Sequence, residues 1–445
     1  MERTDIDPLS DLSRGASAEA SEGGVKQVLI ASVVGTVIEW YDFLVYSTAA
    51  ALVFKDLFFP ANDPFVGAMS AFGAYAVGYF ARPLGGLVFG HFGDRVGRKV
   101  ALLLTLLTTG VGTALVGVLP TYDSIGIWAP ICLIVLRLVQ GIGAGGEWGG
   151  AVLMVVETAP PNRRGLYGSL VQIGNPAGRI LASAAFLPVM LLPREDLLSW
   201  GWRIPFLVSL LMMLVGAFLR ARVSETPAFR RLRAQSKTSK VPALDAFKYY
   251  KRELCIAAGL KMSEVAWPGV LGAFAVTFVH QKFGLPDNVI VTAILIAAGC
   301  ELVCMPLAGA IADKVGRTKV YLFGIISAAI LAFPVMYMIN TGDAFLVSMA
   351  VVIGMVMTQG IMFALQASVI PELFGTAVRY SGVSLGFQVG AAVSGGLTPL
   401  IATGLVHWAS GSVLPVSIYL VSLSVLSLIA FYSIRKRNKA SHLYD

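Results

Sequence analysis

The chain alternates between long apolar runs and short polar connections. Each run reaches about 20 residues, the length that a helix needs to cross the hydrocarbon core of a bilayer. The pattern predicts an all-α membrane protein with twelve transmembrane helices, at roughly 27–54, 66–91, 99–119, 126–157, 166–190, 202–221, 254–281, 288–312, 319–339, 344–370, 380–406 and 413–434. Several runs exceed the minimum, which favours tilt or kinks. Trp267-Pro268 in the seventh run marks an expected break.

The polar connections divide the chain into two halves. Most of the 34 Lys and Arg residues fall in every second connection and near both termini, so the positive-inside rule places these segments in the cytoplasm. The longest connection separates six runs from six. The expected parts are a disordered cytoplasmic tail, an N-terminal six-helix half, a cytoplasmic linker, a C-terminal six-helix half and a second cytoplasmic tail, at 1–25, 26–221, 222–252, 253–435 and 436–445.

Composition agrees with a membrane protein and argues against several other classes. Apolar residues make up 56% and charged residues 13% of the chain, about half the charged share of a soluble domain. The net charge of +8 follows from the loop topology, so we expect no nucleic-acid partner. No metal-ligand spacing or catalytic set occurs, and we expect no enzyme activity, no metal and no cofactor.

The two halves repeat a charged motif. GHFGDRVGRK (90–99) and GAIADKVGRTK (309–319) share Gly, Asp and Val-Gly-Arg at an offset of 219, and both follow the second run of their half. Glu157-x6-Arg164 is repeated as Glu372-x6-Arg379. Two parallel six-helix repeats are one of the standard builds of secondary transporters.

Several of these motifs together resemble one family. GHFGDRVGRK is similar to the loop 2–3 motif of the major facilitator superfamily, and RLVQG (137–141) to its helix-4 motif. EWYDFLVY with LFFP, RPLGGLVFGHFGDRVGRK, GGEWGG and WGWRIPF resemble the metabolite:proton symporter family, to which shikimate, α-ketoglutarate and proline/betaine carriers belong. The resemblance covers residues 26–435. It implies the twelve-helix major facilitator fold, a substrate site between the halves, alternating access and proton-driven uptake across a bacterial inner membrane.

Two acids in the first run are candidates for proton coupling. Glu39 and Asp42 share one helix face near mid-depth, where a charge is costly unless it is paired, hydrated or protonated. Proton-coupled sugar porters of the superfamily pair an acid that follows a Tyr on helix 1 with an Arg on helix 4, and Tyr41-Asp42 and Arg137 resemble that pattern. We expect Asp42 to be the main proton site and Glu39 the second; the alternative is a static ion pair. Glu147 either lines the proton path or is structural.

Arg179, in the fifth run, points to an anionic substrate. It has no acid within one helical turn, and a guanidinium binds a carboxylate through two parallel hydrogen bonds. The alternative is pairing with an acid on another run. Asn175 lies one turn earlier, and Lys261 and Glu264 are spaced to pair. The other candidate substrate-site residues are charged, amide or aromatic residues of the runs: Tyr41, Tyr46, Arg82, Trp267, Glu301, Gln172 and Gln388.

Two further sets follow from the repeats. Arg82 and Glu301 each lie 12 residues before the motif aspartate, so we hypothesise that they form a charge pair in one transport state. The resemblance implies that the repeated charges form a gate of salt bridges that closes the cytoplasmic side. The alternative is that the basic members only enforce topology. The gate set comprises Asp94, Arg95, Arg98, Glu157, Arg164, Asp313, Lys314, Arg317, Glu372 and Arg379.

These observations predict a proton-coupled secondary active transporter that imports a small organic acid. The substrate is a shikimate-like or other mono- or dicarboxylate, carried together with protons. The alternatives are an importer of a zwitterion such as proline or betaine, and a proton antiporter that exports small molecules. We expect a monomer in contact with membrane lipids.

Overall fold

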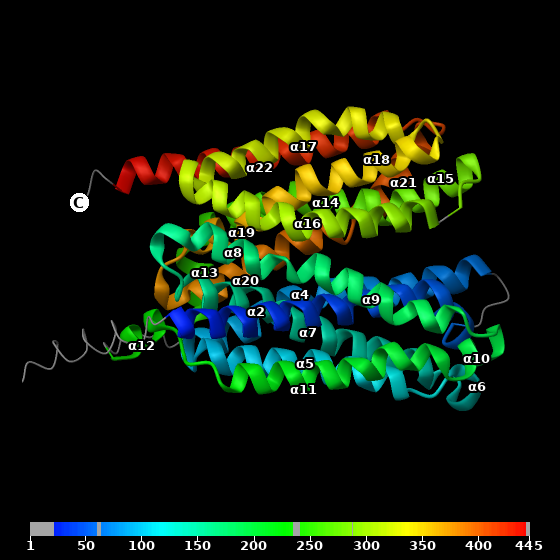
Figure 1. Cartoon of the computed structure of the whole chain (residues 1–445), viewed down its shortest axis with the longest axis horizontal. Helices are drawn as coiled ribbons and strands as arrows, with labels where there is room; N and C mark the ends of the chain where they lie inside the picture. The colour runs from blue at the N-terminus through cyan, green and yellow to red at the C-terminus, as the bar shows by residue number, and fades with distance from the viewer. Residues whose placement is uncertain (1–21, 60–63, 235–240, 287, 442–445) are drawn as a thin grey trace, which may run out of the picture.

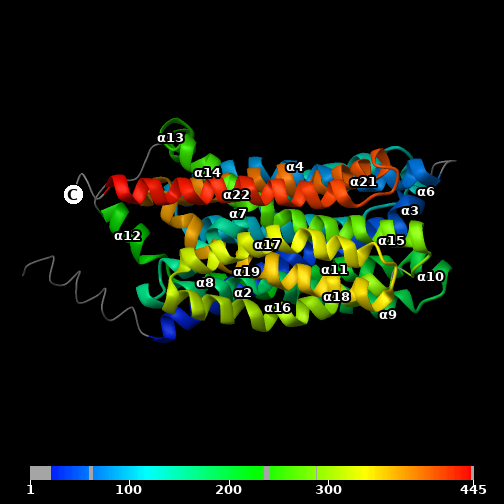
Figure 2. The ribbon, with the colours of Figure 1, turned by 90° about the horizontal axis from the view of Figure 1, so that it is seen from above.

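The computed structural model describes residues 22–59, 64–234, 241–286 and 288–441. Within these ranges the chain is helical, and the long helices run side by side along one axis (Figures 1 and 2). Residues 1–21 of the expected tail lie outside the described ranges. The N-terminal half consists of α2 (Glu22–Ala49), η1 (Ala50–Phe54), α3 (Lys55–Leu57), α4 (Pro64–Arg95), α5 (Arg98–Val118), α6 (Tyr122–Ile125), α7 (Trp128–Val156), α8 (Arg164–Gln172), α9 (Gly174–Met190), α10 (Arg194–Ser199) and α11 (Ile204–Ala221).

The expected linker contains two short helices, α12 (Pro227–Ala234) and α13 (Pro242–Tyr249). The C-terminal half then repeats the six spans, with several of them interrupted. Its elements are α14 (Lys251–Gly269), η4 (Val270–Phe274), α15 (Ala275–Phe283), α16 (Asn288–Val315), α17 (Arg317–Ile339), α18 (Ala344–Gly354), η5 (Met355–Gly360), α19 (Ile361–Val369), α20 (Arg379–Gly390), η8 (Ala391–Gly395), α21 (Thr398–Trp408) and α22 (Leu414–Ser441).

Ten helical segments of the described chain are long and apolar enough to cross a membrane. The other two expected spans are α4 and the α8–α9 pair. The second of these is split at Ile173, directly before the Gly-Asn-Pro start of α9. At the expected break in the seventh span the helix changes its winding but continues from Lys251 to Phe283. Pro268 lacks an N–H, and the wide turns of η4 begin two residues later.

Glycine ends the second span of each half in the same way. Gly97 and Gly316 follow α4 and α16 with φ of 139° and 108°, a region that side chains with a Cβ rarely adopt. The repeated motif therefore encodes the same sharp turn twice, between the second and third span of each half.

The helices pack closely where small residues meet. A Cβ on Gly145 of α7 would lie 2.0 Å from the carbonyl oxygen of Arg82 on α4, and a Cβ on Gly141 would lie 2.3 Å from that of Gly78. Close backbone approach of this kind is typical of helix pairs in membranes.

Apolar side chains also cover the outside of the bundle. On α11, Leu207, Leu211, Leu214 and Phe218 are all exposed, at the spacing of one helix face. Exposed apolar surface of this extent needs a lipid environment, and the chain is a multi-pass membrane protein.

Candidate functional site

The two acids of α2 are buried inside the N-terminal half. Asp42 is 1% exposed and accepts a hydrogen bond from the Ser209 hydroxyl of α11. Arg137 of α7 lines the same small pocket as Asp42 and Glu39. Its guanidinium carbon lies 4.0 Å from the centre of the Tyr46 ring. The structure thus brings the expected proton site and its expected partner together.

Arg82 is the second buried cation of this pocket. Its Nη1 lies 4.0 Å from Glu39 Oε1, and three rings surround it, with centroids 4.5 Å (Phe43), 5.1 Å (Tyr79) and 5.9 Å (Trp40) from its guanidinium carbon. Among the described residues, Nε and Nη2 of Arg82 have no hydrogen-bond partner, although the side chain is almost fully buried. A buried donor without an acceptor is costly, and the Arg82 guanidinium carries two such donors.

Glu147 has a partner that sequence analysis missed. Its carboxylate accepts hydrogen bonds from the Thr105 hydroxyl at 2.6 Å and from Arg220 Nη1 at 2.9 Å, and also pairs with Arg220 Nη2. Arg220 lies in the last turn of α11, at the end of the expected sixth run, and the sequence analysis assigned it no role. It fits there because Gly35 of α2 leaves room for its guanidinium.

Arg179 pairs across the two halves. Its Nη2 donates to Asn175 Oδ1 at 2.9 Å, and its Nη1 lies 3.5 Å from Glu301 Oε2 on α16. The alternative considered for Arg179, an acid on another span, therefore holds in this structure. Arg82 and Glu301 are engaged with different partners here, within the part of the chain that the structure describes. Their mutual pairing stays a prediction for another state.

Lys261 and Glu264 form the local pair that their spacing predicted. The Lys261 ammonium lies 4.0 Å from the centre of the Phe387 ring and 4.7 Å from that of Phe363. Gln366 of α19 lies 3.4 Å from the same ammonium. The pair is buried against aromatic rings near the junction of the two halves.

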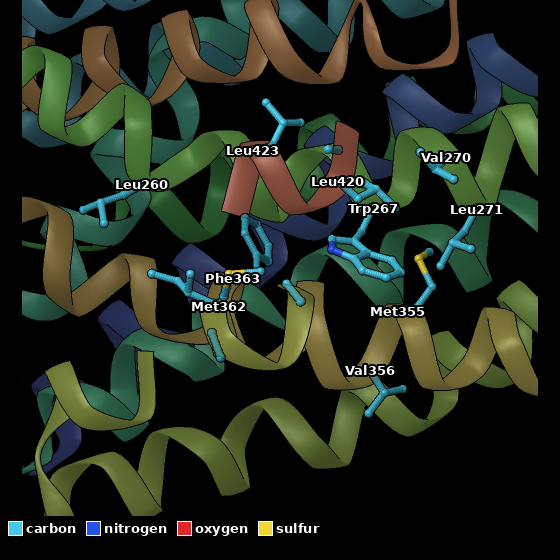
Figure 3. Packing of buried hydrophobic residues seen from close by; sticks show 14 of the residues in the cluster. Leu260, Trp267, Val270, Leu271, Met355, Val356, Met362, Phe363, Leu420 and Leu423 are labelled. Carbon is cyan, nitrogen blue, oxygen red and sulfur yellow. The ribbon is translucent and has the colours of Figure 1, made fainter. Parts of the chain in front are cut away.

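The remaining aromatic candidates lie inside the helix packing. Tyr41 donates to the carbonyl of Pro205 at 2.8 Å. Trp267 is fully buried in the C-terminal core, where Figure 3 shows it among Leu271, Met355 and Leu420. The sequence could give the depth of these rings but not which side of the helix faces the other half.

The two candidate glutamines join the halves. Gln172 Nε2 donates to the carbonyl of Phe363 at 2.9 Å, and Gln388 Nε2 donates to that of Gly145 at 3.2 Å. Gln172 also accepts from Trp148 Nε1 at 3.1 Å, and Trp148 stacks on Phe387 with centroids 3.6 Å apart.

The repeated aspartates occupy equivalent positions. Asp94 accepts from the backbone N–H groups of Tyr380 (3.1 Å) and Ser381 (2.8 Å) at the start of α20. Asp313 accepts from those of Gly165 and Leu166 (both 2.8 Å) at the start of α8. Each half therefore supplies a carboxylate to the N-terminus of a helix in the other half, where carboxylates are stabilised.

Most of the other candidate gate residues gather around these aspartates. Arg98 lies 3.4 Å from Asp94 and 3.6 Å from Glu157, and Arg379 reaches Glu157 from the other half at 3.2 Å. Arg317 and Glu372 pair at 2.7 Å. Arg164 is half-buried, and Arg95 and Lys314 are exposed. We call the end of the bundle that carries these residues the gate end. In this structure, ion pairs and hydrogen bonds join the two halves at the gate end.

Asp94 lies in the last turn of α4 at the gate end, past the apolar run 66–91, and burial raises the pKa of its carboxyl to about 6. The charge of Arg98 and the hydrogen bonds from Ser381 and Tyr380 act in the opposite direction.

Comparisons with known proteins agree with this architecture. The model of the Major Facilitator Superfamily matches residues 33–388. The Escherichia coli K12 shikimate transporter is 36% identical over 90% of this chain and 92% of its own length. The inner membrane metabolite transport protein YhjE of the same strain is 37% identical over 91% and 92%. A putative proline/betaine transporter of Staphylococcus aureus COL is 33% identical over 91% and 87%.

Among solved structures, the proton:xylose symporter XylE superposes with a TM-score of 0.72 at 18% identity. The match covers 93% of this chain and 96% of XylE, and at this identity it shows the fold alone. The expected fold is confirmed: two six-helix halves with twelve spans. The chain belongs to the Major Facilitator Superfamily of membrane transporters.

Proposed function

We propose that the chain is a proton-coupled secondary active transporter that imports a small organic acid by alternating access. The relatives named as shikimate, metabolite and proline/betaine transporters support transport of a small metabolite. We further propose that the protein lies in a bacterial inner membrane as a monomer, with the gate end and both termini in the cytoplasm. The excess of Lys and Arg in the connections at that end supports this orientation.

The observation that carries the proposal is the state of Arg82. A guanidinium with two unpartnered nitrogens, buried among aromatic rings, offers a carboxylate strong charge-assisted hydrogen bonds. Glu39 lies beside it at 4.0 Å without filling those positions. Arg179 supplies a second cation at the junction of the halves. We assign Arg82 and Arg179 as the principal substrate-binding residues.

Proton coupling is assigned to Asp42, with Glu39 second. Asp42 is buried and held by a hydroxyl of α11, and Arg137 lies in the same pocket. A carboxylate in this position can be held charged by Arg137 or neutral by a proton, and the two states differ in charge by one unit. Coupling arises when the proton and the substrate together stabilise the state that changes its open side.

A zwitterionic substrate is the second candidate, because of the rings around Arg82. Trp40, Phe43 and Tyr79 present aromatic faces close to the candidate carboxylate site. Aromatic faces are the usual recognition element for a quaternary ammonium, so glycine betaine would satisfy both features. A panel that includes betaine separates the two candidates.

The test is uptake of labelled shikimate, benzoate, 2-oxoglutarate and glycine betaine into proteoliposomes with an acidic exterior. We expect one of these to accumulate, the accumulation to collapse with a protonophore, and Asp42→Asn to abolish it. Asp123→Asn, at an exposed acid between the third and fourth spans, is the matched control and should transport normally. Efflux driven by inward proton movement would instead establish an antiporter, and transport indifferent to the gradient would leave a facilitator.

A further inference from the structure

The Arg179–Glu301 pair joins the two halves in the middle of the bundle. Glu301 lies midway along the 28-residue helix α16, and Arg179 lies on the span formed by α8 and α9. The Glu301 side chain is 0% exposed and the Arg179 side chain 11%. Oε2 of Glu301 faces Arg179, while Oε1 has no hydrogen-bond partner among the described residues. The carboxylate is therefore only half satisfied.

This pair cannot stay fixed through a transport cycle. Alternating access moves one half against the other, and the pair bridges them at 3.5 Å. Separating two buried charges without replacement partners costs several kcal/mol. After separation Arg179 still has its hydrogen bond to Asn175. Because that amide is neutral, the guanidinium also needs an anion. Glu301 then needs either a new cation or a proton.

On the basis of the proposed function, we infer that in this structure Glu301 binds Arg179 at the position where the substrate carboxylate binds during transport. Substrate entry then displaces Glu301, which leaves Arg179 as a protonated, neutral acid. In the exchange, the substrate carboxylate forms the ion pair with Arg179 as the Glu301 pair breaks. The displaced Glu301 carboxylate binds one proton from the open side. One anion replaces another at Arg179, one proton enters with the substrate, and the charge balances.

Few other charged groups face Glu301. Glu264 of α14 acts on it electrostatically, and Lys261 balances Glu264. Cys304 lies one turn along α16. Of the other elements packed on α16, η4, η5, α18 and α19 carry no Asp, Glu, Lys, Arg or His. In η2 (Pro161–Arg163), α8, α15 and α17, the other ionisable residues lie near the ends of the spans that these elements form: Arg163, Arg164, Tyr167, His280, Lys282, Arg317, Lys319 and Tyr321. Tyr337 of α17 is exposed.

The first test is the pH dependence of the apparent KM for the acid that the wild-type protein accumulates from the panel. With the Glu301 carboxylate as competitor, the KM should rise as the external pH rises. In Glu301→Gln the KM should change little with pH. At alkaline pH it should be about tenfold lower than the wild-type KM, because the variant lacks a competitor that occupies the wild-type site about nine-tenths of the time. Glu301→Asp retains a carboxylate and should retain the pH dependence.

The second test detects the proton directly. Infrared difference spectra on addition of the same acid, labelled with carbon-13 to shift its own bands, should show a new protonated carboxyl group. The signal should appear in the wild type and in Asp42→Asn and disappear in Glu301→Gln. A signal that persists in Glu301→Gln, or a KM in that variant that keeps the wild-type pH dependence, overturns the inference.

The two proposals fail in different ways. A wild-type protein that accumulates none of the four probes refutes the proposed function. A wild-type protein that accumulates a probe by a proton gradient while Glu301→Gln behaves like the wild type refutes only the role of Glu301. Counterflow exchange of the probe by Glu301→Gln shows that the variant is folded.

Discussion

Asp94→Ala should open the gate end. The substitution removes the acceptor of two buried backbone N–H groups, those of Tyr380 and Ser381, at the start of α20. Each buried donor left without an acceptor costs about 1–3 kcal/mol. The loss of both costs at least about 2 kcal/mol, which changes the equilibrium between closed and open gate ends about 30-fold.

Accessibility of a buried cysteine measures this equilibrium. Ala367 is 0% exposed and faces Gly168 across the junction of the halves. Ala367→Cys, in a chain whose four native cysteines are replaced, should react slowly with an impermeant maleimide. With Asp94→Ala added, labelling from the gate end should be about 30-fold faster. Asp313→Ala removes the equivalent pair of hydrogen bonds in the other half and should act similarly.

An exposed ion pair provides the control. Arg317–Glu372 also lies at the gate end, but the Glu372 side chain is 57% exposed, and exposed pairs contribute about 0–1 kcal/mol. Glu372→Gln should therefore change the labelling rate less than about fivefold. Equal labelling rates in Asp94→Ala and the wild type, in protein that still transports, would show that the aspartate bonds do not hold the gate end closed.

The same residue predicts a pH effect. Its pKa is about 6 in the closed state and close to the ordinary value of about 3.9 once the carboxyl is in water. The closed state then binds the proton more tightly, so closure is favoured as pH falls through about 6 and the gain is lost above it. Labelling of Ala367→Cys, relative to that of a fully exposed cysteine at the same pH, should slow on acidification at the gate end, and Asp94→Asn should remove that relative dependence.

Two other substitutions test the packing and a buried charge pair. Gly145→Ala places a Cβ 2.0 Å from the carbonyl oxygen of Arg82. It should cost about 1–3 kcal/mol or more, seen as a lower Tm in detergent, whereas Gly299→Ala meets nothing within 4 Å and should leave the Tm unchanged. Glu147→Gln leaves Arg220 buried without its carboxylate and should cost about 3–5 kcal/mol. Combining it with Arg220→Met should recover most of that loss, and a double variant less stable than Glu147→Gln would contradict this account.

The spans and the clustering of the repeated charges could be predicted from sequence because their signals are local. Hydropathy gives the depth and length of each helix, and Gly97 and Gly316 occupy the same position of the repeated motif with the same kind of positive φ. Asp94, Arg98, Glu157 and Arg379 converge because the repeat marks the helix ends, which must meet wherever the halves close.

The distant partners of Glu147 and Arg179 could not be predicted in the same way. Glu147 pairs with Arg220, 73 residues away, and Arg179 with Glu301, 122 residues away. Such pairs depend on how each helix is rotated about its axis and on which helix lies beside it. A sequence gives the depth of a residue in the membrane but not this rotation, so Arg179 appeared to lack an acid that the fold supplies.

The repeats also differ where the coupling chemistry is proposed, and the difference indicates which half holds the proton. Glu39 and Asp42 on the first span correspond, at an offset of 222, to Lys261 and Glu264 on the seventh. In the C-terminal half the two residues neutralise each other as an ion pair, so a proton added there would break an existing bond. In the N-terminal half both positions are acids, and Asp42 accepts a hydrogen bond from the Ser209 hydroxyl. A proton on Asp42 removes a buried charge that its neighbour Glu39 cannot neutralise, although Glu39 itself lies 4.0 Å from Arg82. Proton binding is therefore expected to centre on the N-terminal half, with Glu301 as the contribution of the other half through its contact with Arg179.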